Sequence, residues 1–89
     1  MIINGFIIPP GETIVECLAL DNISVSEFSK KLGMTEKDTV DLLNGNKHLT
    51  TEIASKLEEI FKAPASFWIN LEQIYRDELD KGYTFIKEV

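Results

Sequence analysis

The 89-residue sequence has little of what most catalytic, metal-binding or membrane proteins need. With one cysteine and one histidine it cannot form an internal disulfide, and it offers no Cys/His cluster with metal-ligand spacing. No apolar run approaches the ~18 residues of a membrane span, and the N-terminus lacks the basic-then-apolar layout of a secretory signal. There is no nucleophile–base pair, and no glycine-rich loop follows a strand. We therefore expect a cytoplasmic, non-enzymatic protein without a metal or cofactor.

Positive charge is also scarce. Nine Lys and Arg residues stand against fifteen Asp and Glu residues, which gives a formal net charge of −6. The imbalance lies outside residues 24–50, which contain four acids and four bases, whereas residues 1–23 contain three acids and no base. Nucleic-acid-binding proteins usually present a basic surface to the phosphates. The charge is therefore the main physical argument against nucleic-acid binding.

Residues 24–45 carry the most informative pattern, two short helices joined by a glycine turn. Ser24 and Glu27 have the spacing of a capping box, and Gly33 supplies the left-handed residue that ends the first helix. Thr35 can cap the second helix, which an Asn-Gly pair would end. Two helices joined in this way form a helix-turn-helix unit, whose second helix can lie in the DNA major groove. The pattern alone is only moderately specific, because other helical hairpins are commoner.

The rest of the sequence predicts three further helices and two extended ends, and so five short helices in all. In residues 1–10, an Asn-Gly pair between apolar residues indicates a hairpin with very short arms. Helical apolar spacing follows this arm, and begins again after Thr50 and at Pro64. These patterns predict one domain over residues 11–82, with the extended arm before it and an extended tail at residues 83–89.

The same spacing predicts which side chains form the core. Ile14, Val15 and Leu18 should make the buried stripe of the helix that follows the arm. The C-terminal helix has a wide apolar face that includes Trp68 and Tyr75. Most of this face, with Trp68 as a core residue, should complete the core, although Trp68 and Tyr75 are large enough to leave some surface for a partner.

Three stretches carry a resemblance to a known family. They are PPGE from Pro9 to Glu12, SxxE…LG…LLNGxxxLT from Ser24 to Thr50, and PASFWINLEQIYR from Pro64 to Arg76. Together they resemble the HigA-type (VapI-like) antitoxins of the Xre/Cro/cI helix-turn-helix family. The resemblance implies an all-α, five-helix, lambda-repressor-like domain. It also implies a homodimer that binds a palindromic double-stranded DNA operator, represses its own operon and neutralises a RelE-like toxin protein.

The resemblance assigns DNA contacts to the helix-turn-helix unit and the loop after it. The side chains expected at base edges are Glu36, Lys37, Asp38 and Asp41. The full set of expected DNA-contacting residues is Ser24, Ser26, Thr35, Glu36, Lys37, Asp38, Asp41, Asn44, Lys47 and His48, with Lys30 and Lys31 as further nearby cations. Carboxylates can accept from a cytosine amino group, but they repel phosphates. His48 has no partner acid or cysteine in the sequence pattern, which favours a surface residue over a catalytic base.

Two departures from the family pattern keep a second interpretation open. Val25 stands where the family often has a phosphate-contacting glutamine, and Thr39 stands where an aliphatic core residue is usual. Either the second helix is slightly rotated, or Val40 faces the groove. The sequence is thus consistent with a DNA-binding antitoxin, and also with a degenerate helix-turn-helix protein that acts through protein contacts without reading DNA.

Overall fold

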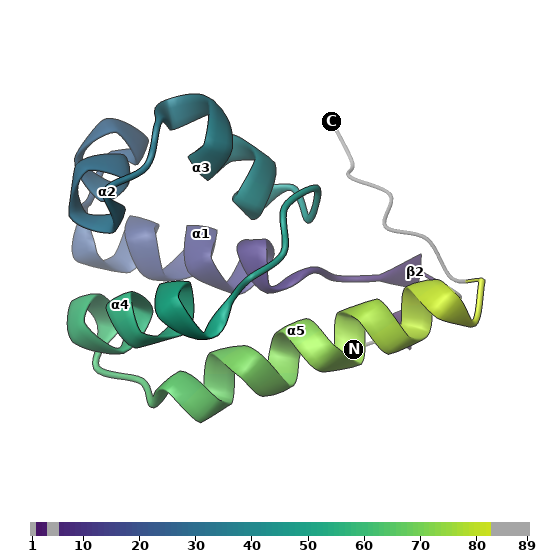
Figure 1. Ribbon diagram of the computed structural model, residues 1–89. Helices are drawn as coiled ribbons and strands as arrows, with labels where there is room; N and C mark the ends of the chain where they lie inside the picture. The colour runs from purple at the N-terminus through teal and green to yellow at the C-terminus, as the bar shows by residue number, and fades with distance from the viewer. Residues whose placement is uncertain (1, 4–5, 83–89) are drawn as a thin grey trace.

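The computed structural model describes residues 2–3 and 6–82, with side chains from residue 8 onward (Figure 1). The elements are β1 (Ile2–Ile3), β2 (Phe6–Ile7), α1 (Pro10–Asp21), α2 (Val25–Leu32), α3 (Glu36–Leu43), α4 (Thr51–Phe61) and α5 (Ala65–Asp80). This arrangement confirms the predicted all-α, five-helix domain with a short extended arm. The extended tail predicted at residues 83–89 lies outside the described residues.

The N-terminal arm forms the predicted hairpin. Its two strands pair antiparallel, with Ile2 opposite Ile7 and Ile3 opposite Phe6. A two-stranded hairpin of this size is marginal by itself in water. β2 also lies against α5, so the arm is docked on the helical domain (Figure 1).

Short polar side chains begin three of the helices at the predicted positions. The side-chain oxygens of Ser24, Thr35 and Thr50 each accept a hydrogen bond from the backbone N–H three residues later, at 3.1–3.2 Å. These bonds satisfy N–H groups that have no partner within the helix. At the other end of α2, Lys56 Nζ donates to the carbonyl oxygen of Leu32 at 2.7 Å, which ties α4 to α2.

The core lies where the helices meet. Its fully buried side chains include Trp68, Phe28, Ile14, Leu32 and Leu57. The rings of Phe28 and Trp68 both lie beside Phe61, with centroid distances of 5.8 and 6.0 Å. This aromatic contact joins α2, α4 and α5 around one centre.

Two predictions about burial are wrong. Val15 is 40% exposed, although its neighbours in the predicted stripe, Ile14 and Leu18, are buried. The expectation that Trp68 serves the core is confirmed, but Trp68 and Tyr75 keep no more than 4% of their surface exposed and so leave almost none for a partner. The apolar surface of α5 belongs instead to the residues just before them, Phe67 and Ile74, which are 42% and 46% exposed. Consecutive residues point about 100° apart around a helix, so each of these neighbours turns away from the core.

The helix predicted to read DNA is held very close to α1. At Gly11, an added Cβ would overlap the backbone carbonyl group of Leu43, the last residue of α3. Glycine is the residue that permits such an approach of two backbones. The distance between α1 and α3 is therefore set by main-chain contact.

Candidate nucleic-acid interface

α3 has one packed side and one open side. Thr39, Leu42 and Leu43 are buried where the helix packs on α1 and α2. Glu36 and Lys37 are exposed, and so is Val40, 43% of whose surface is accessible. The sequence left open whether α3 is rotated or Val40 faces outward. The structure shows the second arrangement, with Thr39 fully buried.

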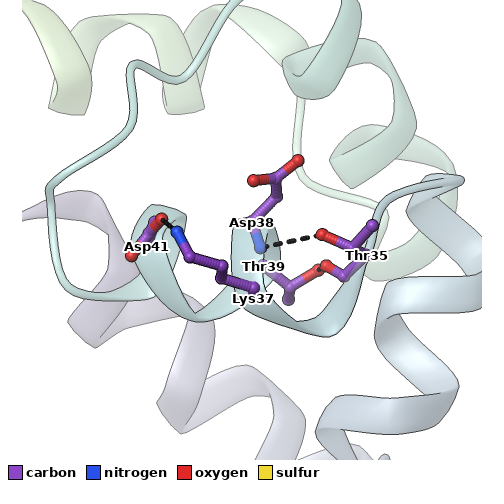
Figure 2. A network of polar contacts seen from close by, with 5 residues as sticks. All are labelled: Thr35, Lys37, Asp38, Thr39 and Asp41. Carbon is purple, nitrogen blue, oxygen red and sulfur yellow. Dashed lines mark hydrogen bonds and ion pairs between the residues drawn. The ribbon is translucent and has the colours of Figure 1, made fainter.

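A pair of hydroxyl groups explains how a polar residue occupies this core position. The Thr39 hydroxyl donates to the carbonyl oxygen of Thr35 at 2.8 Å (Figure 2). The Ser29 hydroxyl of α2 lies 2.9 Å from Thr39 Oγ1 and 2.8 Å from the carbonyl oxygen of Val25, and its single proton can serve either acceptor. Buried hydroxyl groups satisfied in this way carry little desolvation penalty. The Ser29–Thr39 contact therefore replaces apolar packing between α2 and α3.

The one lysine of α3 is paired with an acid of the same helix, which leaves the helix acidic. Lys37 Nζ lies 3.2 Å from Asp41 Oδ2, with side chains that are 83% and 36% exposed (Figure 2). Exposed ion pairs contribute only about 0–1 kcal/mol to folding stability. Lys37 can therefore leave Asp41 for another anion with little loss of stability. Glu36 and Asp38 lie in the first turn. There they favour the helix through its dipole while placing negative charge at its N-terminal end.

The loop after α3 is held by side chains of α5. Arg76 Nη2 donates to the carbonyl oxygen of Lys47 at 3.2 Å, and Arg76 Nε donates to Glu72 Oε2 at 2.8 Å. His48 Nδ1 lies 3.3 Å from the same Glu72 oxygen. The expectation that His48 has no acidic partner is therefore wrong, because the partner comes from a helix 24 residues further along. The predicted surface position is confirmed, since the His48 side chain is 76% exposed.

The start of this loop rests on Tyr75. Gly45 has a φ of +81°, and a Cβ there would lie 2.7 Å from the Tyr75 hydroxyl oxygen and 3.0 Å from Pro9 Cβ. The Arg76 guanidinium lies 5.0 Å from the centre of the Tyr75 ring. Burial raises the pKa of the Tyr75 hydroxyl above its ordinary value, against a smaller lowering effect of Arg76. The ring is therefore a neutral support beneath the loop.

Sequence reasoning missed the contribution of α5 to this region. Glu72 and Arg76 have the i,i+4 spacing of a helical ion pair, and that signal was available. The spacing does not indicate that the pair reaches Lys47 and His48. Only the path of the chain brings them together.

Every residue predicted to contact DNA retains some accessible surface. The exposed ones are Ser24, Ser26, Thr35, Glu36, Lys37 and His48, and the partly exposed ones are Asp38, Asp41, Asn44 and Lys47. They lie on α2, α3, the turn between them and the loop that follows. Ser24 and Thr35 also use their hydroxyl oxygens to cap the two helices.

Other kinds of site have little support. Among the described residues, no group of acids, cysteines and histidine could hold a metal ion. Within the same part of the chain, no helix has both the length and the apolar character needed to cross a membrane. Burial raises the pKa of the half-buried Cys17 thiol, and the Asp21 and Glu16 carboxylates raise it further. Cys17 is therefore a poor nucleophile.

Comparison with known sequences identifies relatives with the same kind of domain. No family model matches the sequence. The uncharacterized HTH-type transcriptional regulator YddM of Escherichia coli (strain K12) is 32% identical over 66 residues, which cover 74% of this chain and 70% of YddM. The uncharacterized HTH-type transcriptional regulator YbaQ of the same strain is 31% identical over 64 residues. That match covers 71% of this chain but only 57% of YbaQ.

A solved structure agrees with these relatives. An addiction module antidote protein of the HigA family from Coxiella burnetii superposes with a TM-score of 0.73 and 32% sequence identity. The match covers 81% of this chain and 79% of that protein, and so includes most of both molecules. The chain belongs to the HigA-type antitoxins of the Xre/Cro/cI helix-turn-helix family.

Proposed function

We propose that this protein is a sequence-specific DNA-binding transcriptional regulator that acts as a homodimer on a double-stranded operator. The observation that carries the proposal is the position of α3, which is packed on one side and accessible on the other. A helix-turn-helix dimer presents two such helices to half-sites about one DNA turn apart. Two-fold symmetry of the protein would then match a palindromic operator.

The outward side chains of α3 suggest how bases are read. Lys37 can donate to guanine in the major groove, and Val40 can contact a thymine methyl group. Glu36, Asp38 and Asp41 can accept from cytosine amino groups. The contacts proposed for the sugar–phosphate backbone come from Ser24, Ser26, Thr35, Asn44, Lys47 and His48, with Lys30 and Lys31 nearby.

The cations near α3 in each protomer of the proposed dimer set an upper limit on the salt dependence of DNA binding, while the acids of α3 oppose attraction to the phosphates. Each phosphate neutralised by a protein cation contributes about −0.9 to the slope of log affinity against log salt. The cations near the proposed interface are Lys30, Lys31, Lys37 and Lys47. Much of the operator affinity must then come from base contacts and shape complementarity.

The test is an anisotropy titration of the dimer against the promoter of its own operon, at about 100 mM salt. We expect binding that Lys37→Ala weakens without changing the melting temperature. Lys81→Ala is a matched control, because it removes a cation from the C-terminal end of α5. Absence of binding at micromolar dimer would contradict the proposal.

We also propose that the protein represses its own operon and neutralises a RelE-like toxin. The support is its family and the Coxiella burnetii relative, which is described as an antidote protein. A small toxin gene next to this one, whose growth inhibition is relieved by co-expression of this protein, would support this role. Continued growth inhibition despite soluble expression of both proteins would contradict it.

A second candidate function is action through protein contacts alone. The acidic α3 and the exposed apolar side chains of Phe67 and Ile74 favour this alternative. It predicts a stable complex with the toxin and no binding to the promoter. A double substitution of Phe67 and Ile74 by aspartate would then abolish complex formation, whereas Lys37→Ala would leave it intact.

A further inference from the structure

We propose that Arg76 and Glu72 of α5 are positioning residues, which hold the loop at residues 44–50 so that Lys47 and His48 reach the DNA backbone. The inference rests on the DNA-binding function proposed above. It assigns a role in DNA recognition to a helix that is separate in sequence from the helix-turn-helix unit. The argument comes from three contacts that converge on the loop.

The first contact holds the main chain of the loop. Arg76 Nη2 donates to the backbone carbonyl oxygen of Lys47, and the contact does not involve the Lys47 ammonium group. Arg76 is itself fixed, because its Nε donates to Glu72 and its guanidinium lies over the Tyr75 ring. A planar guanidinium can make both donor contacts at once, which a lysine ammonium could not do with the same geometry.

The second contact orients His48. Its Nδ1 lies 3.3 Å from Glu72 Oε2, while most of the ring is exposed. The Glu72 side chain is only 11% exposed, so a mostly buried acid holds one edge of an otherwise accessible ring. The same Oε2 atom accepts from Arg76 and faces His48, and therefore couples the two neighbouring loop residues.

The third contact fixes the beginning of the loop. Gly45 lies so close to Tyr75 that an added Cβ would be 2.7 Å from its hydroxyl oxygen. Tyr75 lies between Glu72 and Arg76 in sequence, so one turn of α5 holds the loop near residue 45 and again at residues 47 and 48.

Neutralising Glu72 distinguishes a positioning role from a simple charge effect, because the two predict opposite changes in DNA affinity. Glu72→Gln removes a negative charge near the proposed interface, so Coulomb attraction alone predicts tighter DNA binding. The positioning role predicts the opposite, because Arg76 and His48 lose their shared acid. We expect Glu72→Gln and Arg76→Ala each to lower operator affinity by about threefold to tenfold. Asp77→Asn is the matched control, because it neutralises an exposed acid on the same helix, and it should bind as tightly as the unchanged protein or more tightly.

A double-mutant cycle separates positioning from a direct phosphate contact by Arg76. If Arg76 acts through the loop, then Arg76→Ala combined with Lys47→Ala weakens binding little more than Arg76→Ala alone, because Arg76→Ala already displaces Lys47. The salt slope of the double variant then equals that of Lys47→Ala. If Arg76 itself binds a phosphate, the two losses add and the magnitude of the salt slope falls further, by about 0.9 for each protomer or about 1.8 for the homodimer. That result would overturn the positioning role.

Amide hydrogen exchange of the DNA-free protein completes the test. We expect faster exchange at residues 45–49 in Arg76→Ala and Glu72→Gln, with core helices unchanged, and no change in Asp77→Asn. Unchanged exchange in both variants, or tighter operator binding by Glu72→Gln, overturns the proposal even if the unchanged protein binds DNA. Failure of the unchanged protein to bind its operator is a different result, which overturns the proposed function itself.

Discussion

The two ends of α3 are fixed in different ways. Its N-terminal end is fixed by near neighbours, since Thr35 caps it and the Thr39 hydroxyl meets Ser29, ten residues away on α2. Its C-terminal end leads into a loop that is held by α5, through an Arg76–Lys47 contact spanning 29 residues of sequence. The first end is built from local signals, and the second depends on the completed tertiary structure.

Substitutions in the two regions should lower the free energy of unfolding by different amounts. Changes at the N-terminal end of α3 should have small effects, because each removes one local bond that has a substitute. Changes to the buried core side chains of α5 should have larger effects, because they remove packing that holds the helix in place. The following predictions test this contrast, from the largest expected effect to the smallest.

Trp68→Ala should lower the free energy of unfolding by about 3–5 kcal/mol, the usual range for loss of a buried large aromatic side chain. Trp68 is fully buried and anchors α5 against Phe61. Phe67→Ala is the control, because this neighbouring ring is 42% exposed, and it should be much less destabilising. Urea unfolding measures both. Equal effects of the two changes would show that α5 is not anchored through Trp68.

Gly45→Ala should lower the free energy of unfolding by about 2–3 kcal/mol, from a positive φ together with crowding against Tyr75. Gly82→Ala provides a comparison, because Gly82 has a φ of +96° and an added Cβ would meet nothing within 4 Å in the described structure. Gly82→Ala should lower the free energy of unfolding by only about 1 kcal/mol. Adding Tyr75→Phe should recover part of the Gly45→Ala loss, because the hydroxyl oxygen is the nearest atom. Equal losses of stability in thermal melts of Gly45→Ala and Gly82→Ala would argue against the contact with Tyr75.

Thr39→Val should lower the free energy of unfolding by about 1 kcal/mol. It removes a buried hydroxyl group but keeps the shape of the side chain, and Ser29 can still donate to the Val25 carbonyl oxygen. Combining it with Ser29→Ala should add little, because both partners of the inter-helix bond are then absent. Chemical denaturation of the two singles and the double variant checks this. Fully additive losses would mean that the two hydroxyl groups act independently.

Asp41→Asn should change the free energy of unfolding by no more than about 0.5 kcal/mol, because its ion pair with Lys37 is exposed. The asparagine side-chain oxygen can still accept from a cytosine amino group. The effect on operator binding should therefore be favourable, since the change releases Lys37 and removes a negative charge from the proposed interface. Lys37→Ala should be equally mild for stability but should weaken binding. Anisotropy titrations of the two variants should therefore move in opposite directions, and unchanged or tighter binding by Lys37→Ala would exclude Lys37 as a DNA contact.

The sequence predicted the local features of the fold well. Helix starts at Ser24, Thr35 and Thr50 depend on a short polar side chain and a backbone N–H three residues later, and both are visible in the sequence. The end of α2 is also visible in the sequence, because Gly33 readily adopts the left-handed conformation that ends a helix. Such features need no knowledge of distant contacts.

The sequence did not predict features that depend on packing between distant segments. The sequence placed Trp68 in the core, but it did not show that Phe67 and Ile74 turn outward, which depends on how α5 is rotated against α4 and α1. The contacts of Arg76 with Lys47 and of Glu72 with His48 depend on the path of the whole chain. For the predicted DNA contacts, the structure establishes accessibility, and binding stays a prediction.

The contact of Gly11 with Leu43 bears on how such a protein could acquire a new operator. Because main-chain atoms set the spacing of α1 and α3, substitutions on the accessible side of α3 leave that spacing alone. Glu36, Lys37 and Val40 can then be exchanged as a set to alter base preference while the scaffold stays constant. Retargeting by library selection should accordingly succeed at those three positions, and should fail wherever Gly11 is also randomised.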